Sequence, residues 1–122
     1  MNQQKVLDDN YNVVDRSFLY YLNERCQFNI ESFWEFYDCI VELGKNNCKQ
    51  GFSLELLRKL NFVYKNILEL FLYHMDSNDG YDIKEFPEEK YTFYLERLDE
   101  AVDALFAGYE IKDETFELKK PK

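Results

Sequence analysis

The fold class follows from residues 29–44, which read NIESFWEFYDCIVELG. Apolar side chains recur here every three or four residues, as they do on the buried face of an α-helix. Asn29 is of a residue type that caps helix N-termini, and Gly44 is of the type that often follows a helix C-terminus. The stretch therefore predicts a strongly amphipathic helix over 30–43.

Acidic side chains occupy the other face of this predicted helix. Their spacing of i, i+4, i+7 and i+11 places them in one row, which consists of Glu31, Glu35, Asp38 and Glu42. Like charges four residues apart repel by about 0.2–0.5 kcal/mol per pair, so the row is a mild cost to the helix. A second acidic row follows later in the chain and consists of Glu96, Asp99, Glu100 and Asp103. Such rows are either a surface for a basic partner or a solvated face.

Three further helices are expected around this one. A loose lead-in over 1–14 precedes a short helix from Arg16 to Arg25, for which Asp15 is a plausible N-cap. Ser53 caps a long helix that reaches Met75, and Phe52 and Leu57 fit a hydrophobic staple at its start. Because this helix is apolar nearly all round at residues 70–73, that end is expected to be central to the core.

The last predicted helix follows a polar break at residues 76–82. Pro87 suits its first position and Gly108 suits the position after its end. Residues 109–118 alternate in hydropathy, which leaves a short strand pair and an ordered tail both open, and 119–122 is expected to be a frayed basic end. The sum is an all-α fold, a compact bundle of three to four amphipathic helices in a single domain over 1–122.

The charge of the chain argues against nucleic acid and against membrane as partners. The formal net charge is −9, and residues 82–117 carry twelve acids against four bases. Phosphates need lysine and arginine, so this balance fits a basic protein partner instead. The five bases within residues 45–65 (Lys45, Lys49, Arg58, Lys59 and Lys65) are expected to pair with acids of a neighbouring helix.

The location is expected to be cytoplasmic. The first residues lack the apolar core of a signal peptide, and no run of 18 apolar residues occurs. The three cysteines, Cys26, Cys39 and Cys48, are odd in number and have no CxxC spacing, which fits a reduced compartment. Cys39 lies beside the apolar stripe and is expected to be a small core residue.

The sequence predicts no catalytic set, no metal site and no cofactor. Residues 76–86 resemble a calcium loop, but when Gly80 takes its glycine position, Met75 and Phe86 fall where acidic ligands belong. His74 is the single histidine and has no Gly-x-Ser-x-Gly elbow or cysteine pair to serve, so it is expected to be a cap or a packed aromatic. The chain is therefore not expected to be an enzyme.

Aromatic residues make up 18% of the chain, and most fall on the apolar stripes. Six fall off or at the edge of the stripes: Tyr20, Tyr21, Phe36, Tyr73, Tyr81 and Phe93. Exposed tyrosines beside acids are typical of protein-binding surfaces, whereas a wide core would bury the same rings. Both interpretations remain open at this point.

Three short stretches carry a resemblance to a known class of proteins. They read RSFLYYL (16–22), FNIESFWEFY (28–37) and VEL (41–43), and together they span 16–43, about a quarter of the chain. This run of a short helix followed by an aromatic, acidic helix with a tryptophan resembles small immunity proteins of bacterial toxin–immunity systems. The relevant systems are those of polymorphic toxins and of contact-dependent growth inhibition.

The resemblance implies a cytoplasmic protein that binds one cognate toxin and blocks it, often a nuclease with a basic cleft. The partner-binding residues would then be the two acidic rows, Glu31, Glu35, Asp38 and Glu42 first, then Glu96, Asp99, Glu100 and Asp103. The alternative is another cytoplasmic protein-binding module, such as a phage-encoded inhibitor or an adaptor.

Overall fold

The computed structural model describes residues 2–47, 51–78 and 80–121, and its regular structure is helical throughout these ranges. The α-helices are α1 (Gln3–Tyr11), α2 (Phe18–Glu24), α3 (Ile30–Asn47), α4 (Leu54–Met75) and α5 (Tyr91–Ala107), and a 3-10 helix η1 spans Asp113–Thr115. No strand occurs in these ranges, although one isolated bridge joins Gln27 to Lys84. The prediction of a compact all-α fold is confirmed, but the α-helices number five rather than three or four.

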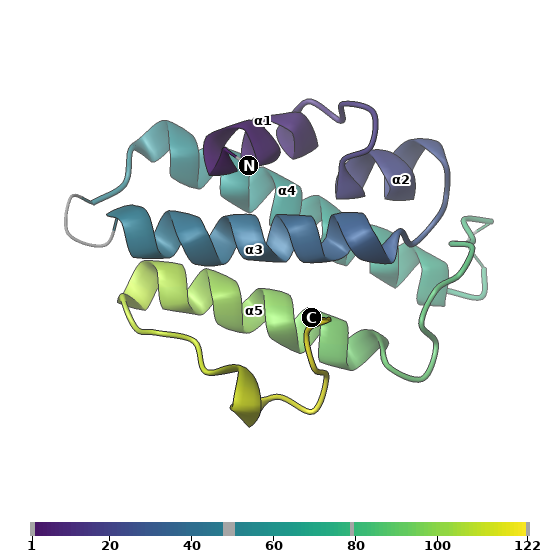
Figure 1. The fold of residues 1–122 in the computed structure, drawn as a ribbon. Coiled ribbons are helices and arrows are strands. Elements are labelled where there is room, and N and C mark those ends of the chain that lie inside the picture. Colours follow the sequence, from purple (N-terminus) through teal and green to yellow (C-terminus); the bar gives the residue numbers. More distant parts are fainter. Residues whose placement is uncertain (1, 48–50, 79, 122) are drawn as a thin grey trace.

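The core lies around α3, which is the central helix of the fold (Figure 1). In this view α1 and α2 lie above α3, α5 lies below it, and α4 crosses behind α3 and contacts α1 and α2. Aromatic rings fill the middle: Phe28 and Phe33 stack at 5.8 Å, and the Tyr94 ring of α5 meets both edge-on at 5.1 Å and 4.9 Å. Edge-to-face contacts of this kind add about 0.5–1.5 kcal/mol per pair to simple burial.

The expectation of a loose lead-in over 1–14 is wrong, because most of that stretch is α1. The Asn2 side chain accepts hydrogen bonds from the backbone N–H groups of Gln4 and Lys5, which caps the helix. Val6 and Leu7 are buried. Asn10 is also buried, and its amide donates to the Val6 carbonyl and accepts from Leu19 N–H, so it ties α1 to α2.

The next helix, α2, is shorter than the predicted Arg16–Arg25. Arg16 has a φ of 76°, which belongs to the left-handed region and is incompatible with a right-handed helix. Ser17 is the N-cap in place of Asp15, and its hydroxyl accepts from Tyr20 N–H at 3.2 Å. The chain therefore turns sharply between α1 and α2.

Helix α3 starts where predicted but does not stop at Leu43. Asn29 caps it by accepting from Ser32 N–H at 2.9 Å, as expected. Gly44 lies inside the helix and not after it. A Cβ atom built at Gly44 would lie 3.3 Å from the Leu105 Cα atom of α5, so this glycine permits the close approach of two helices.

The cap of α4 is confirmed, because the Ser53 hydroxyl accepts from Leu56 N–H at 3.1 Å. Both staple residues, Phe52 and Leu57, pack partly buried against the core. The expected central position of residues 70–73 is only half right. Phe71 is buried, whereas Leu72 is 68% and Tyr73 45% exposed.

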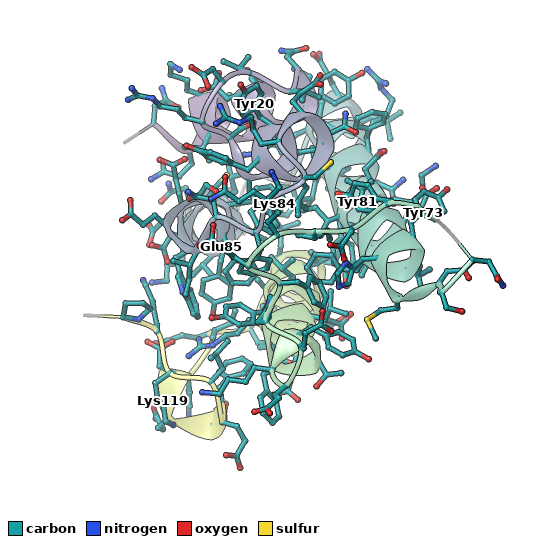
Figure 2. The ribbon with its side chains drawn as sticks, turned by 90° about the vertical axis from the view of Figure 1, so that its right-hand side faces the viewer. Tyr20, Tyr73, Tyr81, Lys84, Glu85 and Lys119 are labelled. Atoms are coloured by element: carbon teal, nitrogen blue, oxygen red, sulfur yellow. The ribbon has the colours of Figure 1, made fainter. Side chains whose placement is uncertain are left out.

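The segment between α4 and α5 is longer than predicted, because Pro87 does not begin a helix. Pro87 accepts a turn hydrogen bond from Lys90 N–H, and α5 starts at Tyr91. Figure 2 shows Tyr81, Lys84 and Glu85 along this segment. It is held to the loop before α3 by hydrogen bonds between Lys84 and residues 26 and 28.

Residues 109–118 form an ordered tail and no strand pair. Gly108 ends α5 with a φ of 80°, as its position in the sequence predicted. Phe116 is buried, and the Lys119 side chain reaches the Glu114 carbonyl. Lys120, in the stretch expected to fray, pairs with Asp38 of α3 at 2.6 Å.

Candidate functional site

The structure keeps the first acidic row together along α3. Glu31 is exposed, and the other three acids are partly buried. Those three line a hollow of about 190 Å³ between α1 and α3, whose full lining is Gln3, Val6, Glu35, Asp38, Cys39 and Glu42. The row is therefore one continuous acidic surface with a depression on its α1 side.

Basic side chains of the same molecule already lie on this row. Asp38 binds Lys120 at 2.6 Å, and Glu42 lies 3.6 Å from Lys45 one turn later. Lys5 of α1 has a pKa above its ordinary value, chiefly because its ammonium donates to Asp9, with a smaller contribution from Glu35. The row thus attracts ammonium groups within its own molecule.

The second acidic row, on α5, is engaged by tyrosines. Asp99 accepts from the Tyr64 hydroxyl at 3.2 Å, and burial together with Asp99 raises the pKa of Tyr64 to about 12. Glu100 and Asp103 lie 2.8 Å and 2.9 Å from the Tyr109 hydroxyl, which has one proton to donate. Glu96 is exposed. None of these four acids lines the hollow between α1 and α3.

The off-stripe aromatic residues divide between core and surface. Phe36 was placed off the stripe by its spacing, but it is fully buried. Tyr81 is partly buried and donates to the Leu22 carbonyl, and burial raises its pKa. Tyr73 lies on the outer side of α4 (Figure 2). Tyr20, Tyr21 and Phe93 are partly buried. These rings do not form the single exposed aromatic surface that one interpretation required.

Of the two alternatives for His74, a cap or a packed aromatic, the structure supports the packed aromatic, and the C-cap of α4 is Asp76. Its Nδ1 atom accepts from Ile83 N–H at 2.9 Å, and Nε2 lies 2.8 Å from a Glu88 carboxylate oxygen. Since Nδ1 is an acceptor, the ring carries its proton on Nε2 and donates it to Glu88. The ring also packs against Phe86 at 4.1 Å. His74 therefore closes the end of α4 against the segment that follows.

Arg97 is the residue that sequence reasoning missed. It lies on the buried face of α5 and is 0% exposed. Its Nη1 donates to the Tyr37 hydroxyl and to Asp113, each at 2.8 Å, while Nε and Nη2 both donate to the Leu118 carbonyl. Each of the three guanidinium nitrogens therefore has an acceptor, and Asp113 balances the charge.

Aromatic rings complete the surroundings of Arg97. The guanidinium carbon lies 4.0 Å from the centre of the Phe116 ring, and the rings of Tyr37 and Trp34 lie at 5.3 Å and 5.4 Å. Cation–π contacts strengthen when water is excluded, as it is here. Arg97 thereby fastens the tail, through Asp113, Phe116 and Leu118, to α3 and α5.

Trp34 has an unusual feature beside Arg97. Its side chain is buried, yet its Nε1–H has no hydrogen-bond acceptor among the residues that the structure describes. A buried donor without an acceptor costs about 1–3 kcal/mol. The same ring also makes favourable contacts, a cation–π contact with Arg97 and edge-on contacts with Phe33 and Tyr37.

An apolar groove lies between the C-terminal halves of α3 and α5. Its volume is about 350 Å³. Its walls are Ile40, Val41, Gly44 and Lys45 of α3, Ala101, Ala104 and Leu105 of α5, and residues 108–111 of the tail. A groove of this size is within the range of ligand pockets, about 300–1,000 Å³.

In the described part of the chain, Cys39 is a core residue, and Lys59 of the basic stretch stabilises the fold through salt bridges. Cys39 is buried, and burial is the main cause that raises its pKa to about 12, so its thiol stays protonated. Lys59 pairs with Asp8 of α1 at 2.8 Å and with Glu55 at 3.2 Å, which confirms the expected pairing for this base. Cys48 and Lys49 lie outside the described residues.

Metal ligation finds no support in the described part of the chain. Within residues 2–47, 51–78 and 80–121, no three His, Cys, Asp or Glu side chains cluster so that they would hold a metal ion. Asp79, within the 76–86 stretch that resembles a calcium loop, lies outside these ranges. The described helices also include none with the length and apolarity needed to cross a bilayer.

Comparison with known proteins leaves the family of this chain open. No protein-family model, no curated protein and no solved structure matches it. The site is therefore defined by its own geometry, an acidic row on α3 beside an apolar groove.

Proposed function

We propose that this protein is an immunity-type inhibitor, which binds a cognate bacterial toxin domain and neutralises it. The toxin would be a basic protein, such as a nuclease with a substrate cleft lined by lysine and arginine. The observation that carries the proposal is the acidic row Glu31, Glu35, Asp38 and Glu42, which runs along a single helix and attracts the molecule's own ammonium groups.

The mechanism would be occlusion with charge complementarity. Carboxylates along α3 would take the place of substrate phosphates in a basic cleft, and the net charge of −9 would speed the encounter. Charge of this kind determines partner choice and association rate more than total affinity. Apolar contacts at the centre of the interface would supply most of the binding energy.

Affinity capture from the source cell tests this proposal. The tagged chain is incubated with cell extract at low salt, the bound fraction is released at high salt, and its proteins are identified by mass spectrometry. We expect one basic toxin domain in a one-to-one complex, whose catalytic activity falls when the chain is added back. Recovery of nothing, or of an unrelated set of abundant proteins, would contradict an immunity role and favour a general protein-binding module.

A further inference from the structure

The apolar groove between α3 and α5 lies next to the acidic row on the same helix. Lys45 lines the groove and lies 3.6 Å from Glu42, the last acid of the row. Val41 lines it one residue before Glu42. A partner segment that follows the row along α3 therefore reaches the groove at the C-terminal half of this helix.

Small and large apolar residues both line the groove. The small ones are Gly44, Ala101, Ala104 and Gly108, and the large ones include Ile40, Leu105 and Ile111. A leucine or phenylalanine side chain that enters such a groove is removed from water, and the affinity gained by that burial exceeds tenfold.

The surroundings of the groove favour a basic occupant. Glu110 lines it directly. Tyr109 also lines it, and the Tyr109 hydroxyl lies within 2.9 Å of two further carboxylates, Glu100 and Asp103. Among the described residues, two bases accompany these acids and Glu42: Lys45 lines the groove, and Lys112 lines a neighbouring hollow with Glu100 and Glu110, which gives four carboxylates to two bases. Lysine and arginine on the partner would be attracted to this rim, whereas phosphate groups would be repelled.

We infer that this groove receives an apolar side chain from a lysine- or arginine-rich segment of the protein partner. The inference rests on the proposed function and adds to it the kind of segment recognised: one large apolar residue flanked by basic residues. The apolar residue fills the groove, and its basic neighbours meet Glu110 and the carboxylates around Tyr109.

Three synthetic hexapeptides with blocked ends serve as probes. They read Lys-Lys-Phe-Leu-Lys-Lys, Lys-Lys-Ser-Ser-Lys-Lys and Glu-Glu-Phe-Leu-Glu-Glu, so they separate apolar character from charge. Each is titrated into the full ¹⁵N-labelled chain and followed by amide chemical shifts. We expect the first peptide to shift Gly44, Leu105 and Ile111, and the other two to bind at least tenfold more weakly.

A matched pair of variants locates the binding. Ala104→Leu adds three carbon atoms inside the groove, whereas Ala107→Leu makes the same change at an exposed position of α5 outside its lining. Ile111→Ser removes an apolar wall from the tail side without adding volume. We expect Ala104→Leu and Ile111→Ser each to weaken the first peptide at least tenfold and Ala107→Leu to leave it unchanged.

Several outcomes would overturn the inference. These are equal binding of the serine peptide, equal binding of the glutamate peptide, binding that Ala104→Leu leaves intact, and no binding of any peptide at millimolar concentration. The same variants separate this inference from the proposed function. If a captured toxin binds Ala104→Leu as tightly as wild type, the toxin does not bind in the groove, but the proposed immunity function is retained. If the first peptide binds in the groove but capture yields no toxin, the immunity role fails alone.

Discussion

At the scale of single residues, Arg97 determines how the last part of the chain is placed. Its guanidinium joins Tyr37 of α3, Asp113 of η1 and the Leu118 carbonyl, and Phe116 covers it. Burying a charge is costly unless it is paired and hydrogen-bonded, and here Tyr37 of α3 and the tail supply the acceptors. Arg97 thus holds residues 113–118 of the tail to the helices.

Replacement of Arg97 should therefore release the tail. We expect Arg97→Ala to lower the free energy of unfolding by about 3–5 kcal/mol, because it leaves a cavity and unpaired polar groups. Arg97→Lys keeps the charge but not the planar fork of donors, so its free energy of unfolding should lie between those of wild type and Arg97→Ala. Urea unfolding gives the free energies. Acrylamide quenching of Trp34, the single tryptophan, reports whether this buried ring, 5.4 Å from the Arg97 guanidinium carbon, becomes exposed. An unchanged free energy of unfolding in Arg97→Ala would contradict the anchoring role.

Asp113 should make stability depend on pH at the acidic end. The hydrogen bond from Arg97 holds the pKa of Asp113 below its ordinary value of 3.8. A carboxyl with a lowered folded pKa stabilises the protein above its unfolded pKa, and this contribution is lost as pH falls through the folded pKa. We expect Asp113→Asn to be less stable than wild type at pH 7, with a smaller difference at pH 3, as measured by urea midpoints.

The neighbouring acid provides the control for Asp113. Glu114 is exposed, and its side chain makes none of the contacts described with Arg97. Glu114→Gln should leave the midpoints unchanged at both pH values. A difference between wild type and Asp113→Asn that stays constant from pH 7 to pH 3 would show that Arg97 does not perturb this carboxyl.

The apolar periodicity of the sequence places position 97 on the buried face of α5, but the charge of arginine argued against its burial. Tyr94, Leu98, Ala101 and Leu105 define the buried stripe of α5, and position 97 lies on the same face, three residues after Tyr94 and four before Ala101. The identity of its partners was not accessible, because Tyr37, Asp113 and Leu118 come from distant parts of the chain. The fold, and not the local sequence pattern, determines which distant groups hydrogen-bond to a buried charge.

At the scale of elements, Gly44 sets the distance between α3 and α5. Glycine inside a helix costs roughly 0.5–1 kcal/mol relative to alanine, so its place inside α3, near the C-terminal end, calls for a packing reason. That reason is the Leu105 Cα atom, 3.3 Å from the position of an added Cβ. We expect Gly44→Leu to lower the free energy of unfolding by about 1–3 kcal/mol through overpacking.

The control for Gly44 is a leucine of equal size at an exposed site. Asn46→Leu lies two residues later on α3, where the side chain is exposed. It should change the free energy of unfolding by no more than about 0.5 kcal/mol. Equal stability of Gly44→Leu and Asn46→Leu in thermal or urea unfolding would show that the two helices are not in close contact at this glycine.

Helix interiors were predictable from the sequence, and helix ends were less so. The stripes of α3 and α4 and the caps Asn29 and Ser53 follow from local patterns that the structure reproduces. Helix α1 was missed because its nine residues are mostly polar and bury only Val6, Leu7 and Asn10. Gly44 was wrongly predicted to end a helix and Pro87 to begin one, because local propensity contains no information on the packing of α5.

At the scale of the whole molecule, charge should determine partner binding. The acidic row lies on α3, while Lys59 is paired with acids of α1 and α4 and braces the fold. We expect Glu35→Lys/Asp38→Lys to bind the basic partner at least tenfold more weakly than wild type, because two attractive charges become repulsive. The remaining affinity should depend less steeply on salt. The row was predictable from its spacing, but its contact with Lys120 was not, because it depends on how the tail folds back. The Glu42–Lys45 pair lies one turn apart on α3 and was missed because the helix was expected to end at residue 43.

The most direct test of the acidic-row claim is capture from the source cell with three chains in parallel. Wild type is compared with Glu35→Lys/Asp38→Lys and with Glu24→Lys/Glu89→Lys, which changes the net charge equally at two exposed sites away from the row. Circular dichroism first confirms that all three are folded. The account predicts that wild type and the Glu24/Glu89 variant retain the same basic protein and that the Glu35/Asp38 variant loses it. Equal retention by all three chains would contradict the claim that the acidic row of α3 binds the partner.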